Sequence, residues 1–186
     1  MISLDGMAPL AVVGLLSLCW IAIGIGTGWV GNRVNLDRLD HDTWLTRARA
    51  FEDGGRFYDR TLRIRLWKDR LPERGDTFRD GFSKSHLTGR SEAHLERFIA
   101  ETRRAEYVHW ANVAASVVFA VFLPRWIVVV MVPFGLVVHL PFVAIQRYNR
   151  ARLQRTVARR RLRATRRAKS ALDLGSTDAL GYRLPT

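Results

Sequence analysis

The chain has 186 residues, of which 48% are hydrophobic, and its formal net charge is +13. Its single cysteine, Cys19, excludes a disulfide framework and a cluster of thiolate metal ligands. The sequence has no G-x-S-x-G elbow, no P-loop and no glycine-rich dinucleotide fingerprint, so it does not indicate a serine hydrolase, a P-loop nucleotidase or a Rossmann enzyme.

The first element is an uncharged apolar stretch from Met7 to Gly31, long enough to cross a bilayer. Asp5 precedes it and no Lys or Arg does, which differs from the basic start of a secretory signal. Residues 1–31 are therefore predicted to be a retained N-terminal transmembrane anchor. Gly24 and Gly28 form a G-x-x-x-G pattern that would permit close helix packing, although glycine is also simply common in membrane spans.

Residues 32–106 are charged, with 17 Lys and Arg against 14 Asp and Glu, and they also carry many aromatic residues. A segment of this size and polarity cannot build a large core of its own. We expect a cytoplasmic segment of amphipathic, aromatic helices that lies against the membrane. A new helix is predicted from Ser91, and no Pro or Gly interrupts the chain from there to Leu123.

Residues 107–146 are predicted to form a transmembrane helical hairpin. The 39 residues from Tyr107 to Ile145 contain one charged side chain, Arg125. As a single helix they would span about 58 Å, roughly twice the hydrocarbon thickness, so two crossings that turn near Pro124 are favoured. The chain is thus expected to be an all-α integral membrane protein with three transmembrane helices, its cytoplasmic segment lying between the first and second.

The distribution of basic residues predicts the orientation. Residues 147–186, a basic tail, hold 12 Lys and Arg against 2 Asp and Glu, whereas the N-terminal leader and the Arg125 turn together offer one basic residue. The positive-inside rule then predicts a multi-pass protein of the cell membrane with its N-terminus outside and its C-terminus in the cytoplasm. Leu153, Val157, Ala164, Ala168 and Leu172 recur at helical intervals in the tail, which favours binding to anionic lipid headgroups over nucleic acid.

Three histidines are candidates for chemistry. Glu106 and His109 share a helix face where charge gives way to apolar sequence, and a carboxylate there could orient the ring and raise its basicity. An interfacial pair that only hydrates the helix end is an equal alternative. His86 lies in a polar loop and His139 inside the third span, and a surface or structural role is open for both. A di-iron site in a helix bundle uses two E-x-x-H motifs, whereas this sequence has one and only five histidines, so no metal is expected.

The hairpin would bring together two polar stretches, residues 101–110 and 146–150. Gln146-Arg-Tyr-Asn-Arg150 combines amides with two arginines, and these donors suit phosphate, thioester or sugar oxygens.

These residues carry a resemblance to a known family. The chain resembles the glycosyl-diaponeurosporenoate acyltransferases, small membrane proteins that complete the carotenoid staphyloxanthin by esterifying its sugar with a fatty acid. The similarity covers roughly residues 30 to 153. The matching blocks are Gly31-x-Arg33, Phe51-Glu52 with Gly55-x-Phe57, Arg65-x-Trp67-Lys68, His86-Leu87, Glu101-Thr-x-Arg-Ala-Glu106, His109-Trp110, and Pro141 followed by Gln146-Arg-Tyr-Asn-Arg150.

The chain departs from that pattern in three places. Ala151 replaces a proline, His139 replaces an amide, and the arginine-rich tail is longer. The resemblance implies a fatty acyl thioester donor, either acyl-CoA or an acyl carrier, and a lipid-linked sugar acceptor in the membrane. No other cofactor is expected.

The combined hypothesis is a membrane-bound O-acyltransferase. His109 supported by Glu106, or else His86, would act as the general base. Substrate binding is assigned to Glu101, Arg104, Gln146, Arg147, Asn149, Arg150 and His139, together with Trp67 and Lys68. A non-catalytic membrane scaffold of a lipid or glycan pathway is the main alternative, and an iron-dependent lipid oxygenase a weaker one.

Overall fold

The computed structural model describes residues 6–71, 91–119 and 124–181, with side chains as far as residue 170. Every regular element in these ranges is a helix. The three long elements are α1 (Pro9–Arg33), α3 (Glu92–Ala115) and α5 (Arg125–Gly181). Between α1 and α3 lie short helical turns: η1 (Leu36–Leu39), η2 (Ala50–Gly55), α2 (Arg56–Arg60), η3 (Ile64–Leu66) and η4 (Lys68–Arg70), and η6 (Ser116–Val118) follows α3 directly.

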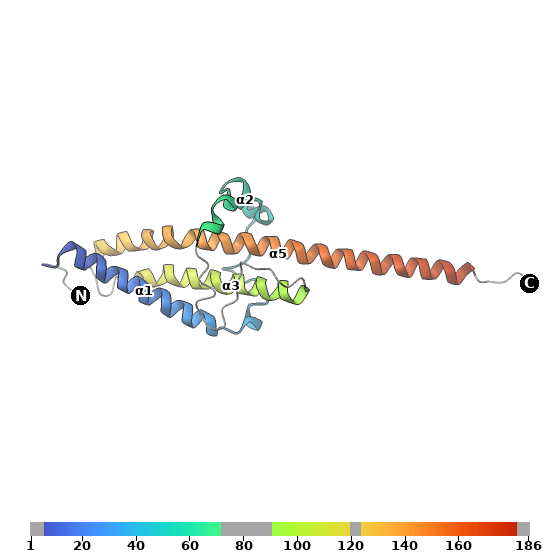
Figure 1. The fold of residues 1–186 in the computed structure, drawn as a ribbon, viewed down its shortest axis with the longest axis horizontal. Coiled ribbons are helices and arrows are strands. Elements are labelled where there is room, and N and C mark those ends of the chain that lie inside the picture. The colour runs from blue at the N-terminus through green and yellow to red at the C-terminus, as the bar shows by residue number, and fades with distance from the viewer. Residues whose placement is uncertain (1–5, 72–90, 120–123, 182–186) are drawn as a thin grey trace, which may run out of the picture.

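The long helices lie side by side, with α3 antiparallel to both α1 and α5 (Figure 1). The chain passes from α3 to α5 at the end of the bundle where α1 begins, and α5 continues well beyond its neighbours at the other end. This antiparallel arrangement of α3 and α5 is the one that a hairpin between residues 107 and 146 requires. The helix α3 begins next to Ser91, as predicted, and the Ser91 hydroxyl caps it by accepting a hydrogen bond from the His94 N–H at 3.2 Å.

Among the residues that the structure describes, two helices, α1 and α5, are long and apolar enough to cross a membrane. The regular part of α3 ends at Ala115 and tightens into the 3₁₀ turn η6, so the structure does not supply the uninterrupted helix predicted as far as Leu123. The all-helical class is confirmed for the described ranges, and a crossing by α3 stays a prediction.

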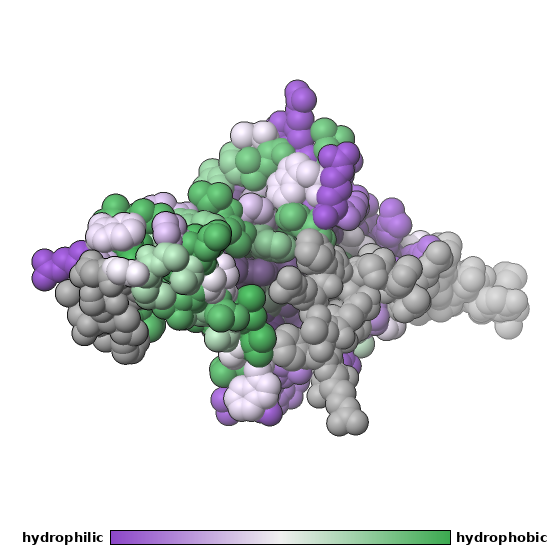
Figure 2. Space-filling view, turned by 60° about the vertical axis from the view of Figure 1, so that its left-hand side comes forward, coloured by the Kyte–Doolittle hydropathy of each residue, from purple (hydrophilic) through white to green (hydrophobic). Residues whose placement is uncertain are grey.

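The apolar face of the bundle is open to its surroundings. Gly31 is the buried residue of α1, whereas Leu10 is 86% exposed and Val129 of α5 is 73% exposed. Figure 2 shows apolar side chains gathered on the face formed by α1 and the first part of α5. Such a surface is far more apolar than water tolerates on a monomer, and it indicates association with a membrane.

The helices α1 and α3 make a tight contact at Gly31. A Cβ built on Gly31 would lie 2.3 Å from Val108 Cγ2, so α1 and α3 approach there as only a glycine allows. At Gly24 a Cβ would lie 3.9 Å from Asn112 Oδ1, an ordinary contact. Gly31 is one turn beyond the predicted G-x-x-x-G pair.

The middle segment packs on α5 rather than lying apart from the bundle. Tyr58 and Ile64 are buried against Ile145 and Tyr148 of α5. The Tyr148 hydroxyl accepts a hydrogen bond from Arg65 Nε at 3.1 Å. These contacts hold residues 50–71 over the end of the predicted hairpin, where the polar residues gather.

Candidate active site

The centre of the polar region is Glu106, whose side chain on α3 is fully buried. Its Oε1 lies 2.7 Å from Arg147 Nε, and its Oε2 lies 2.6 Å from Arg150 Nη2. Trp110 Nε1 also donates to Oε1 at 3.4 Å. A buried carboxylate is tolerated only with such partners, and here both arginines come from α5. The two ends of the hairpin are therefore joined by an ion cluster.

Two acids from the middle segment complete the cluster. Glu52, which is 2% exposed, forms an ion pair with Arg147 Nη1. Asp42 Oδ1 lies 2.7 Å from Arg103 Nε and 3.7 Å from Arg150 Nε. Three acids thus face three arginines, so the charges of the cluster balance, with Asp42 as its exposed member.

Backbone carbonyls of the middle segment also contact the cluster. Arg147 Nη2 donates to the Leu45 carbonyl at 2.5 Å, and Arg150 Nη2 donates to the Thr46 carbonyl at 2.6 Å. The other terminal nitrogen of Arg150, Nη1, is buried and has no acceptor among the residues that the structure describes. A buried guanidinium nitrogen without an acceptor is unusual, and it offers a donor to an incoming oxygen.

A tight turn positions Glu52. Asp53 and Gly54 have φ values of 45° and 59°, and Gly55 has a φ of 96°. A Cβ on Gly55 would lie 3.0 Å from the Ala151 Cβ, so glycine both allows the left-handed backbone and lets the turn rest on α5. Burial, together with the Glu52 carboxylate, raises the pKa of Tyr58, which therefore stays protonated beside the cluster.

His109 of α3 contacts a second histidine, His139 of α5. Its Nδ1 lies 3.2 Å from Nδ1 of His139, and its ring stacks on Phe142 with centroids 4.9 Å apart. Both oxygens of Glu106 are engaged by arginines, so the orientation of the His109 ring by Glu106 stays a prediction beside this histidine pair. The ring of Trp20, from α1, lies 5.9 Å from the His139 ring.

This pair can define a base. When two neutral imidazoles share one hydrogen bond between their Nδ1 atoms, one ring donates and the other accepts. If His109 donates, the lone pair of its neutral ring lies on Nε2, which is then the nitrogen that could accept a proton. His139 thus determines which nitrogen of His109 is available.

The other predicted site residues lie around this centre. Glu101 is buried and pairs with Arg104 at 2.6 Å on the same helix. Gln146 is buried and Asn149 half-buried on α5. Trp67 Nε1 donates to the Leu62 carbonyl at 2.8 Å, and Lys68 forms an ion pair with Asp69, so neither contacts the cluster through these bonds.

One predicted site residue lies outside the described part of the chain, and three members of the cluster were not predicted. His86 lies outside the described residues. Glu52, Asp42 and Arg103 contribute to the cluster without having been assigned to the site. Glu52 was identifiable, since it stands in one of the blocks that carried the resemblance. Within the described residues, no group of three or more His, Cys, Asp or Glu side chains could hold a metal ion.

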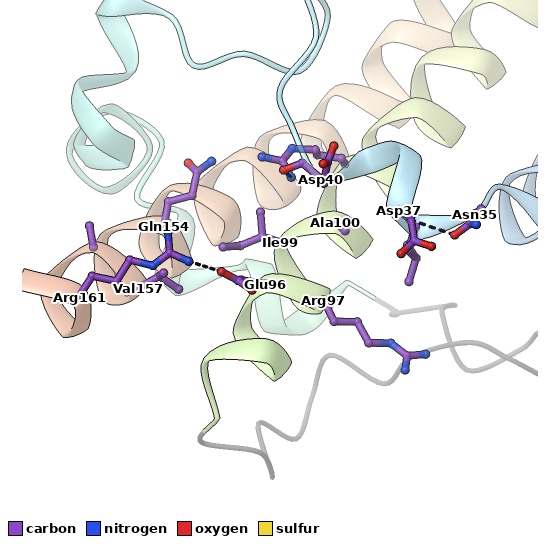
Figure 3. A pocket seen from close by; sticks show the side chains of 13 residues that line it. Asn35, Asp37, Asp40, Glu96, Arg97, Ile99, Ala100, Gln154, Val157 and Arg161 are labelled. Carbon is purple, nitrogen blue, oxygen red and sulfur yellow. Dashed lines mark hydrogen bonds and ion pairs between the residues drawn. The ribbon is translucent and has the colours of Figure 1, made fainter. Parts of the chain in front are cut away.

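A groove of about 870 Å³ lies at the polar end of the bundle, between η1, the start of α3 and α5 (Figure 3). Asp37 and Asp40 line it from η1 and its end, Glu96 from α3, and Arg161 from α5. Arg103 also lines the groove and pairs with Asp42, so the groove adjoins the ion cluster.

A family model described as glycosyl-4,4'-diaponeurosporenoate acyltransferase matches residues 41–159. The chain belongs to this family. The matched part includes the ion cluster, the histidine pair and the first third of the basic tail. The family membership expected from the sequence is therefore confirmed.

Named members of the family from Staphylococcus aureus are distant relatives. The glycosyl-4,4'-diaponeurosporenoate acyltransferase of strain bovine RF122 / ET3-1 is 25% identical over 137 residues, which are 74% of this chain and 82% of the relative. The enzyme of the same name from strain USA300 is 24% identical over the same lengths. No solved structure matches the chain.

Proposed function

We propose that the protein is a membrane-bound O-acyltransferase that moves a fatty acyl group from a thioester to a sugar hydroxyl of a glycolipid. The observation that supports this most is the His109–His139 pair, one helical turn from the buried cluster of Glu106, Arg147 and Arg150. The names of the relatives make a glycosylated carotenoid the first acceptor to test.

In the proposed reaction His109 Nε2 removes the proton from the sugar hydroxyl as its oxygen attacks the thioester carbonyl. A C–O bond forms and the C–S bond breaks. The sulfur leaves as a thiolate and takes the proton from His109, so ester and thiol form in equal amounts. General-base help of this kind contributes about a hundred- to ten-thousand-fold.

Arginine and amide donors would stabilise the charge on the carbonyl oxygen. Arg150 is the strongest candidate, because Nη1 has an unused donor among the described contacts. Asn149 of α5 and Arg104 of α3 are further candidates for this role. Arg147 is engaged by Glu106, Glu52 and the Leu45 carbonyl, which suits it to holding the helices in place.

The proposed orientation places this site on the cytoplasmic side, with the N-terminus outside and the tail inside. The basic tail and the polar middle segment both lie at the end of the bundle far from the Arg125 turn (Figure 1). A cytoplasmic site would meet a thioester donor in water and a lipid-linked acceptor in the membrane.

The test is transfer by the purified protein. Protein in zwitterionic nanodiscs would receive palmitoyl-CoA and a glucosylated carotenoid, with a glucosyl diacylglycerol as a second acceptor. We expect a new ester by mass spectrometry and one thiol released for each ester. A protein that only scaffolds a pathway would form no ester and release no thiol above the rate of empty nanodiscs, and that result would refute the proposal.

A further inference from the structure

Five arginines form one stripe along the part of α5 that follows the ion cluster. Arg152, Arg155, Arg159, Arg163 and Arg166 are spaced by three and four residues, which places them on one helix face within an arc of about 80°. Arg155 is half-buried and the other four are exposed. The first three also frame, with Thr156, a hollow of about 280 Å³.

The direction of α5 in this region is fixed by packing. Leu153 and Val157 are buried with Leu95, Phe98 and Ile99 of α3. Arg161 Nε lies 2.5 Å from Glu92 Oε1, and Nη2 forms a second ion pair with Glu96. The helix α5 therefore packs along the first turns of α3 and then continues straight beyond the start of α3 (Figure 1). The arginine stripe lies on the opposite side of α5 from these contacts.

This geometry removes much of the stripe from a membrane surface. If the crossing ends near Arg147, the rise of the helix puts Arg159 about 18 Å and Arg166 about 29 Å further along. The headgroup layer is only about 5–8 Å thick on each side, and charges are screened over about 8 Å at physiological salt. In addition, Leu153 and Val157 are buried against α3, so their side chains are not available to insert into lipid. The predicted headgroup contact fits Arg152 and Arg155 alone.

We propose that the stripe docks a small acidic protein that carries the acyl chain as a thioester. The inference rests on the proposed function, which needs a thioester at this end of the bundle. From Arg152 to Arg166 the stripe is about 21 Å long, the scale of a protein face rather than of a nucleotide. Residues 147–169 hold 11 basic side chains and no acid, so an acidic surface is the complementary one. After transfer the carrier leaves with its free thiol.

The experiment uses full-length protein in zwitterionic nanodiscs and the triple variant R159E/R163E/R166E. Donors are palmitate held on a purified acidic acyl carrier protein and palmitoyl-CoA. We expect kcat/KM to fall about tenfold or more with the carrier and to change less than about twofold with CoA. The control R160E/R167E/K169E makes the same charge change away from the stripe and should retain most of the activity with both donors.

Binding is measured separately, so that failure of the enzyme reaction remains distinct from failure of docking. Fluorescence anisotropy of labelled carrier should show binding that weakens with salt and is lost in the stripe variant alone, even if no acceptor is turned over. Equal loss with both donors, or unchanged carrier binding, would overturn the proposal. So would a stripe variant that lost binding only to anionic vesicles or to a DNA duplex.

Discussion

Replacing Glu106 by glutamine should destabilise the protein by about 3–5 kcal/mol, because two buried arginines lose their shared counter-charge. Arg147 would keep Glu52, whereas Arg150 would keep only Asp42 at 3.7 Å and a backbone carbonyl. Glutamine has the same shape, so loss of packing would not explain the effect. The measurement is the midpoint of thermal unfolding of the purified protein in detergent.

The control is Asp53→Asn, which removes an exposed ion pair with Arg56 at 3.4 Å. It should leave the midpoint unchanged, because exposed pairs contribute little. The variant Glu106→Gln with Arg147→Gln should lose less stability than the sum of the two single variants, since they share one cluster. A Glu106→Gln protein as stable as the original would show that the cluster does not join the hairpin.

Replacing His109 by alanine should lower kcat about a hundred- to ten-thousand-fold while the protein remains inserted and folded. His139→Asn should keep most of the activity, because an amide can still hydrogen-bond the Nδ1 of His109. His139→Leu removes that bond without adding charge, so it should lower kcat and change the dependence of kcat on pH. The assay is ester formation over a range of pH, beside an unfolding midpoint for each variant.

His86→Ala separates the two candidate bases. If His109→Ala were active and His86→Ala inactive, the base would be His86 and the histidine pair would be structural. Full activity in both variants would contradict catalysis by a histidine in this protein.

The hairpin could be predicted because it follows from length. An apolar run of 39 residues with Arg125 near its middle fits two crossings, and two crossings bring residues 101–110 and 146–150 to one end. The contact between Glu106 and Arg147 shows that they meet. The mixed polarity of the middle segment predicted helices that lie against the membrane, and the packing of Tyr58 and Ile64 on α5 was not part of that prediction.

The partners within the site could not be predicted. Spacing on one helix places Glu106 and His109 on a common face, but it does not say which side chains the neighbouring helix presents. The pairing of His109 with His139 depends on the register of α3 against α5, which tertiary packing decides. Glu52 pairs with Arg147, which is 95 residues away in the sequence, and a left-handed turn that includes Gly55 positions it. The burial of Leu153 and Val157 against α3 could not be predicted either, because their helical spacing suits contact with a lipid surface as well as contact with a neighbouring helix.

The central claim is that α3 and α5 form a hairpin whose two polar ends share one side of the membrane. Single cysteines would be placed in a Cys19→Ser background at Ala93, Thr156 and Arg125, all exposed positions. In intact cells a membrane-impermeant maleimide should label the cysteine at 125 and should label those at 93 and 156 only after the cells are opened. Labelling of 93 and 156 from opposite sides would contradict the account.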